Sequence, residues 1–181
     1  MVIVYIEIIL LLISSFLSDV FKNRIKNSIT FGFSVLGMLT NLIISGFNGL
    51  ASSVLGWLFP VVLLFILYAL RMLGAGDIKF FSAVGAIAGW HFVIPAIIYS
   101  FVFGGIEGLF ILVFDKNASN RFNVFYTYVK SCFLSLSLME YEGFNKSGRD
   151  GTFPFMYAAV PGTLFQMLAA ITGIQVVKLW M

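Results

Sequence analysis

Asp77 is the residue of this chain whose type and setting most need a chemical explanation. It stands in the stretch Gly74-Ala-Gly-Asp-Ile-Lys79, between an apolar run that ends at Leu73 and another that begins at Ile78. A carboxylate at membrane depth is costly, so an acid there is a candidate functional residue. Glycine has no Cβ, so the backbone can turn sharply before this acid and another chain can approach it closely. If a helix begins at Ile78, the acid also suits an ordinary N-terminal cap. This stretch alone leaves catalysis and capping equally open.

A second acid, Asp19, follows the first apolar run and precedes the basic residues Lys22 and Arg24. Two carboxylates at one depth in a partly desolvated site cannot both ionise cheaply, so one pKa rises while the other acid stays charged. The charged acid can then activate a water as general base, and the protonated acid can polarise a carbonyl. Taken singly, Asp19 is better explained as an interfacial charge that balances the two basic residues. Its pairing with Asp77 favours chemistry.

The composition is that of an integral membrane protein. Sixty per cent of the 181 residues are hydrophobic, 10% are charged, and the mean hydropathy is +1.01. We expect an all-α polytopic membrane protein in which residues 1–181 form one membrane-embedded domain. The net charge of +3 is not a nucleic-acid signal here. The single cysteine, Cys132, excludes an internal disulfide and a cysteine zinc cluster, and the single histidine, His91, gives metal catalysis no support. No metal or other cofactor is expected.

Hydropathy predicts six transmembrane helices. Residues 78–114 form a stretch of 37 residues with only two charges, which is too long for one crossing of about 20 residues. Gly89-Trp90-His91 and Pro95 supply a turn that divides it. The predicted spans are 1–18, 28–46, 52–73, two within 78–114, and 153–177. A polar turn around Asn48 is predicted to join the second span to the third.

An N-terminus outside the cell places the loops 19–27, 71–79 and 115–152 in the cytoplasm. These loops contain ten of the eleven Lys and Arg residues and leave only Lys178 outside, as the positive-inside rule requires. Asp19 and Asp77 then lie at the same cytoplasmic edge of a cell membrane, and the ends of their helices can meet. Glu7 precedes Asp19 by twelve residues, or about 18 Å along a helix, so it lies toward the outer side.

The loop 115–152 is the one sizeable polar segment. Residues 122–139 repeat apolar side chains at helical spacing, which predicts an amphipathic helix on the inner membrane surface. A seventh crossing over the same residues is the rival, and Lys130 near its middle disfavours it.

The chain resembles the type IV prepilin leader peptidases, which are aspartic membrane proteases of the GxGD type and include the preflagellin peptidases. The similar segments follow the family's order and topology. They are Asp19 with Arg24-Ile-Lys-Asn27, Gly74-Ala-Gly-Asp-Ile-Lys79, Ala86-Ile-Ala-Gly-Trp90 and Phe153-Pro-Phe-Met-Tyr-Ala-Ala-Val160.

The resemblance implies that Asp19 and Asp77 are the catalytic pair and that Gly74, Gly76 and Lys79 support them. The implied partners are membrane lipid and prepilin-like or preflagellin-like substrates, which would lose a short basic leader at the cytoplasmic face. The family usually has proline where Lys26 stands. Larger members carry a cytoplasmic domain with paired CxxC motifs that methylates the new N-terminus, so this chain resembles the short form without a methyltransferase.

Two roles stay open for Lys79, which could orient the site or depress an aspartate pKa, or could anchor the chain at the interface. The main alternative function is a small transporter or channel-like protein that uses intramembrane acids. Glu107, inside the fifth predicted helix, speaks for it, whereas no internal repeat is visible. A eukaryotic-type intramembrane aspartic protease is disfavoured by the short chain and by the lack of that group's Tyr-Asp and Pro-Ala-Leu signatures.

Overall fold

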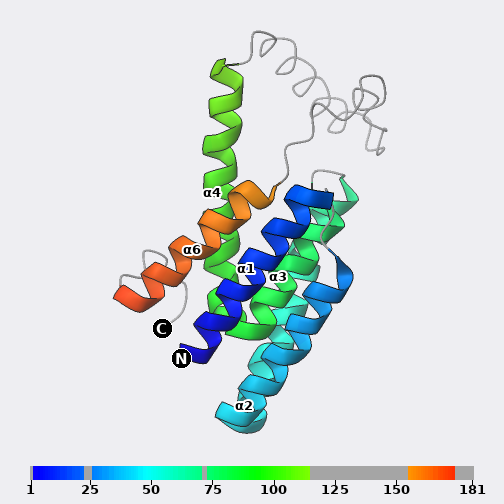
Figure 1. The fold of residues 1–181 in the computed structure, drawn as a ribbon, viewed down its shortest axis with the longest axis vertical. Helices are drawn as coiled ribbons and strands as arrows, with labels where there is room; N and C mark the ends of the chain where they lie inside the picture. Colours follow the sequence, from blue (N-terminus) through cyan, green and yellow to red (C-terminus); the bar gives the residue numbers. More distant parts are fainter. Residues whose placement is uncertain (1, 23–25, 71–72, 115–154, 174–181) are drawn as a thin grey trace. The chain divides into compact units, whose positions relative to one another are not determined.

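The computed structural model describes residues 2–22, 26–70, 73–114 and 155–173 (Figure 1). All regular secondary structure in these ranges is helical, which confirms the predicted fold class there. The chain divides into two compact units, residues 1–104 with 154–181 and residues 105–153. The helices are, in chain order, α1 (Val2–Lys22), α2 (Asn27–Ala69), α3 (Ala75–Ala88), α4 (Trp90–Phe114) and α6 (Met156–Thr172).

The 43-residue helix α2 is a hairpin of two helical arms, because the chain reverses at Gly46. Gly46 has φ of 63° and ψ of −147°, a conformation that residues with a Cβ avoid. Gly37 and Gly56 would lie about 28 Å apart on a straight helix. Instead, a Cβ on Gly37 would meet Ile87 of α3, and one on Gly56 would meet Gly85 of α3. Figure 1 shows the two arms joined at the end of α2 that carries its label.

The two arms of α2 correspond to the predicted second and third spans. The sequence placed the turn between them around Asn48, and the structure corrects this to Gly46. The physical reason is that the reversal needs a positive φ, which only the glycine supplies without strain. Helix α2 ends at Ala69, somewhat before the predicted end of the third span at Leu73.

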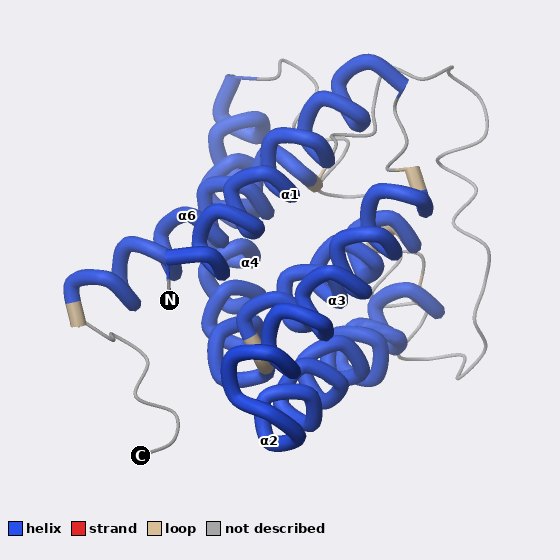
Figure 2. Tube along the Cα trace, turned by 60° about the horizontal axis from the view of Figure 1, so that its bottom comes forward, coloured by secondary structure: helices blue, strands red, loops and turns tan. Residues whose placement is uncertain are grey.

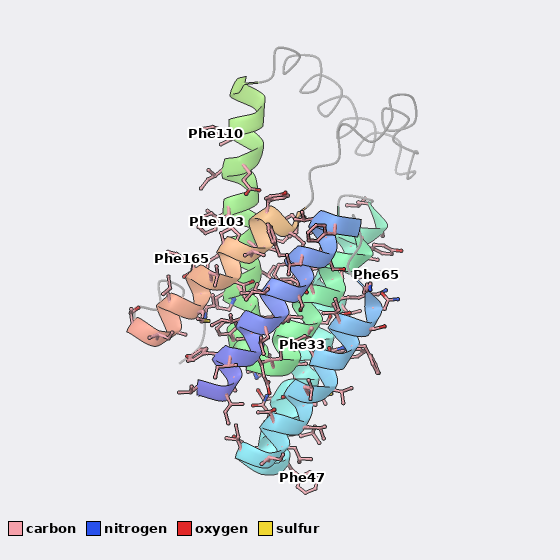
Figure 3. The ribbon with its side chains drawn as sticks, viewed as in Figure 1. Phe33, Phe47, Phe65, Phe103, Phe110 and Phe165 are labelled. Carbon is pink, nitrogen blue, oxygen red and sulfur yellow. The ribbon has the colours of Figure 1, made fainter. Side chains whose placement is uncertain are left out.

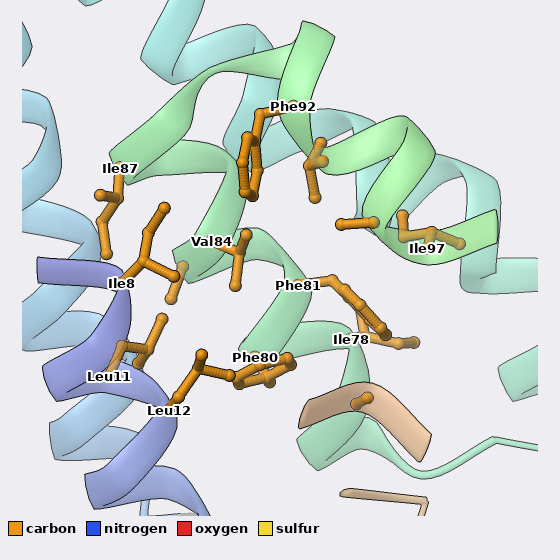
Figure 4. Packing of buried hydrophobic residues seen from close by; sticks show 14 of the residues in the cluster. Ile8, Leu11, Leu12, Ile78, Phe80, Phe81, Val84, Ile87, Phe92 and Ile97 are labelled. Atoms are coloured by element: carbon orange, nitrogen blue, oxygen red, sulfur yellow. The ribbon is translucent and has the colours of Figure 1, made fainter. Parts of the chain in front are cut away.

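Helix α3 lies between α1 and α2 (Figures 1 and 2) and contacts both. Every residue from Phe80 to Ile87 is buried, as expected for a helix that is apolar on all sides. Helix α1 runs antiparallel to α3, so that the start of α1 lies beside the end of α3. Figure 4 shows the α1 side chains pointing toward α3, from Ile8 near Ile87 to Leu12 near Phe80.

Gly89 separates α3 from α4, with φ of 82°, so the predicted break in the long apolar stretch is confirmed at this residue. The prediction was wrong for Pro95, which lies inside α4 rather than in the turn. Proline lacks an N–H and is best tolerated near a helix start, and α4 begins only five residues earlier.

Helices α4 and α6 approach closely within the first unit. A Cβ on Gly162 would meet the backbone of Ser100 at 2.5 Å, so only glycine fits there. The rings of Tyr99 and Phe165 pack edge to face with their centroids 4.8 Å apart. The described part of the predicted last span is α6, residues Met156–Thr172.

Three helices among the described residues are long and apolar enough to cross a membrane: Val2–Phe21 of α1, all of α2, and Trp90–Phe110 of α4. Large apolar side chains on them are exposed, as a lipid-facing surface requires. Phe47 and Phe65 of α2, for example, point away from the ribbon (Figure 3). The total of six crossings and their orientation stay predictions. The loop 115–152, its segment 122–139 and Cys132 lie outside the described residues.

Candidate active site

Asp77 lies in the first turn of α3, which begins at Ala75 and not at Ile78 as the sequence suggested. Gly74, the residue before the helix, has an extended backbone, and alanine is the best helix former, so the helix starts as soon as the glycine turn allows. Asp77 is therefore the third helical residue rather than the cap itself. Its Oδ2 accepts a hydrogen bond from the Gly74 N–H at 3.2 Å, and its own N–H donates to the Gly74 carbonyl at 3.2 Å.

The motif glycines and Asp77 fit one another sterically. A Cβ on Gly74 would lie 3.0 Å from the Asp77 Oδ2, so the missing side chain leaves room for the carboxylate to reach the backbone. Gly76, like Asp77, is partly buried, whereas Gly74 is exposed. The start of α3 thus combines an open edge with a half-buried acid.

Asp19 lies in the last turn of α1 and is 9% exposed. It continues the buried stripe of α1 that packs against α3, made of Ile8, Leu11, Leu12 and Ser15. Because α1 and α3 are antiparallel, the end of α1 lies beside the start of α3. The structure therefore brings together the two acids that are 58 positions apart in sequence.

The pKa of Asp77 reflects the proximity of Asp19. Asp77 belongs to α3, outside the three long candidate membrane helices. Its pKa is raised from 3.8 to about 6. Burial is the largest cause of this rise, the hydrogen bond from Gly74 opposes it, and the negative charge of Asp19 adds to it. An acid with a pKa of about 6 holds its proton much longer than an ordinary aspartate, which suits proton donation near neutral pH.

Lys79 is exposed, and its Nζ donates a hydrogen bond to Asn27 Oδ1 at 2.9 Å. Asn27 is the first residue of α2 and ends the motif segment that follows Asp19. The bond therefore joins the starts of α2 and α3 on the side where both acids lie. The positioning role of Lys79 stays a prediction.

The start of α6 also lies near the C-terminal part of α1 and the middle of α3. Tyr157 packs edge to face on Phe16 of α1 at 5.6 Å, and Phe155 packs on Phe81 of α3 at 6.3 Å. Both belong to the segment that opens the last helix and that the sequence singled out. Its described part thus contacts the two helices that carry the acids.

Sequence reasoning missed the partner of Glu7. Thr40 of α2 donates a hydrogen bond to Glu7 Oε1 at 2.6 Å. Beside it, Asn41 Nδ2 donates to the carbonyls of Ala86 and Ile87, at 3.3 and 2.7 Å, near the end of α3. No periodicity links polar residues 33 positions apart, so no signal could have found this pair. These contacts lie at the opposite end of α3 from Asp77.

Among the described residues, no three His, Cys, Asp or Glu side chains converge in a way that could hold a metal ion. Glu107 is partly buried and belongs to the second compact unit. The site of interest within the first unit is thus the pair of acids with Gly74, Lys79 and the start of α6.

The long apolar helices define a helical membrane protein, and its two neighbouring acids define the candidate site. The chain belongs to the type IV leader peptidase family, whose model matches residues 6–109. It is therefore a peptidase of that family, and the match includes Asp19, Asp77 and the whole Gly74–Lys79 stretch. No curated protein and no solved structure matches the chain.

Proposed function

We propose that this protein is an aspartic endopeptidase that removes the short basic leader from type IV prepilin-like or preflagellin-like proteins. Asp19 and Asp77 are the catalytic residues of this proposal. The observation that supports it is the electrostatic interaction between Asp19 and Asp77, which come from helices far apart in the sequence. The pKa of Asp77 is about 6. An aspartic protease needs two interacting carboxyl groups, of which one is protonated and the other ionised.

The arrangement suggests distinct roles for the two acids. Asp77, with its raised pKa, holds the proton and donates a hydrogen bond to the carbonyl oxygen of the scissile peptide. Asp19, ionised, takes a proton from a water molecule as the water oxygen attacks the carbonyl carbon. The tetrahedral intermediate collapses when the C–N bond breaks and the leaving nitrogen receives a proton from the pair. One water is consumed, and a carboxylate and an amine result.

Gly74 and Lys79 act in this scheme as supports. Gly74 gives its N–H to Asp77 and leaves space for the carboxylate. Lys79 holds the start of α3 to the start of α2 through Asn27. Gly76 is the second residue of α3 and stands directly before the acid.

The substrate assignment rests on the family and on the placement of the acids at helix ends. A prepilin-like chain carries a basic leader followed by a hydrophobic segment, and a site at the membrane edge admits both water and such a chain. We place the site at the cytoplasmic face of the cell membrane, with the N-terminus outside, because this orientation puts ten of the eleven Lys and Arg residues in the cytoplasm. Membrane lipid is then the other constant partner.

The test is the processing of a co-expressed prepilin-like substrate, followed as a mobility shift. Asp19→Asn and Asp77→Asn keep the shape of the side chain but cannot exchange a proton, so each variant should leave the substrate uncut. Glu7→Gln is the matched control, because it changes an acid of the same helix, about 18 Å from Asp19, and processing should persist. Undiminished processing by either aspartate variant, at equal membrane levels, would remove that residue from the mechanism.

A further inference from the structure

Ser15 of α1 is a buried polar residue that the catalytic scheme above does not use. Its side chain is 0% exposed, and its Oγ has no hydrogen-bond partner among the described residues. Several other serines inside helices behave differently. Ser34, Ser82 and Ser100 each donate to the carbonyl four residues earlier, at 2.7 to 2.9 Å. Ser15 forgoes this common bond.

The missing bond has an energetic meaning. A hydroxyl that is buried without a partner loses its hydration and receives nothing in exchange. Such a group is uncommon in folded proteins and needs an explanation. One explanation is that the hydroxyl finds its acceptor only in the working enzyme.

Asp19 is the charged acceptor nearest to Ser15 along α1. The two residues are four apart, and side chains at this spacing are neighbours on one face of a helix, with their Cβ atoms about 6 Å apart. Helical side chains lean toward the N-terminus of the helix, so the Asp19 carboxylate leans over the turn that carries Ser15. Both residues belong to the buried stripe of α1 that faces α3.

We infer that Ser15 is a positioning residue for catalysis: in the resting structure its hydroxyl has no partner in the part of the chain that the structure describes, and when substrate binds it turns to donate a hydrogen bond to the Asp19 carboxylate, which fixes the orientation of the general base. This inference rests on the proposed function. Each acid would then accept one hydrogen bond from a residue close to it in the sequence: Asp19 from the Ser15 hydroxyl, and Asp77 from the Gly74 N–H. The proposed role of Ser15 concerns the orientation of a catalytic group and not the stability of the fold.

Ser15→Ala separates these two roles because it removes only the hydroxyl oxygen. If the hydroxyl acts on Asp19, kcat for a leader-bearing peptide in detergent micelles should fall by about 10-fold or more, and KM should stay within about two-fold. The melting temperature should not fall, because the variant removes a buried group without a partner. A purely structural serine would give the opposite pattern.

Ser53→Ala is the matched control. Ser53 of α2 is also 0% exposed, and its Oγ also has no partner among the residues described. Its neighbour Ser52 lies against Gly89, at the end of α3 remote from Asp77. The control should therefore leave both kcat and KM unchanged.

Asp19→Asn in the same assay distinguishes failure of this inference from failure of the proposed function. An active Asp19→Asn enzyme would overturn the aspartic mechanism and the role of Ser15 with it. An inactive Asp19→Asn enzyme combined with wild-type kcat in Ser15→Ala would overturn the role of Ser15 alone. A Ser15→Ala protein that is less stable than wild type, or that fails to fold, would equally contradict the inference, because the hydroxyl would then be a structural group.

Discussion

Two glycines on the first arm of α2 should respond in opposite directions to the same substitution. Gly37 is buried against α3, and a Cβ there would lie 2.7 Å from the Ile87 Cα and 2.8 Å from the Ile87 nitrogen. Gly32 is exposed, and a Cβ there would meet nothing within 4 Å. The pair isolates the effect of close helix packing, since the backbone and the added methyl group are alike.

The magnitude follows from these distances. Carbon atoms in contact prefer a separation of about 3.5–4.0 Å, so Gly37→Ala requires α2 and α3 to move apart by about 1 Å. Overpacking of this kind costs about 1–3 kcal/mol, against a gain of up to about 1 kcal/mol in helix propensity. We expect Gly37→Ala to lower the free energy of unfolding by about 1–2 kcal/mol and Gly32→Ala to raise it by up to about 1 kcal/mol.

The assay is unfolding of the purified protein in mixed micelles by titration with SDS, followed by tryptophan fluorescence. Ile87 lies ten residues after Asp77, about 15 Å along α3. Substrate processing by the folded Gly37→Ala protein should therefore change little, even though its free energy of unfolding falls. Equal stability of the two variants would show that α2 and α3 do not meet at these residues. A gain of stability in Gly37→Ala would refute the packing argument outright.

Four further predictions concern the site and the turn that ends α3. Folding raises the pKa of Asp77 to about 6, so the folded protein favours the protonated acid. Ionisation of Asp77 therefore lowers the free energy of unfolding. This loss is absent below about pH 4 and complete above about pH 6. Asp77→Asn should therefore raise the free energy of unfolding by about 1–3 kcal/mol at pH 7.5 and leave it unchanged at pH 4, and a stability loss at pH 7.5 would contradict this sign. By the same pKa, processing of a leader-bearing peptide should fall as pH rises above about 6, because Asp77 loses the proton it must donate; a rate that keeps rising to pH 8 would oppose that role. In a double-mutant cycle with Lys79→Met and Asn27→Leu, the coupling in stability should be below about 1 kcal/mol because the pair is exposed, while both variants process substrate more slowly. Gly89→Ala should destabilise the protein by about 1–3 kcal/mol, because φ is 82° there and the new Cβ would lie 2.6 Å from Ser52 Oγ; unfolding at wild-type SDS concentration would show that the turn tolerates a side chain.

The sequence was most informative where one residue type has few physical alternatives. The excess of apolar residues left only a membrane protein, and glycine at position 89 predicted the break between α3 and α4. The stretch around Asp77 was recognisable because an acid between two glycines and a lysine is costly in an apolar region. Asp19 could be paired with it only through topology, because a single orientation of the chain in the membrane places both acids at the same edge.

Other features depend on contacts that the sequence does not display. The start of α3 at Ala75 was missed because glycine and aspartate suit a cap and a first turn almost equally. The reversal at Gly46 was placed too late because Asn48 is also a good turn former. The bonds of Lys79 to Asn27 and of Thr40 to Glu7 join different helices, and helical periodicity says nothing of which polar side chains meet across an interface.

The reversal at Gly46 also bears on biosynthesis. The two arms of α2 leave the ribosome before α3, so they can enter the bilayer as a pair. Helix α3 has 14 residues, or about 21 Å, which is short for a bilayer core of about 30 Å. A segment this short gains little from lipid alone, and its contacts with Gly37 and Gly56 require both arms to be in place. We therefore expect the hairpin at Gly46 to close before α3 packs against it and before Asp77 reaches Asp19.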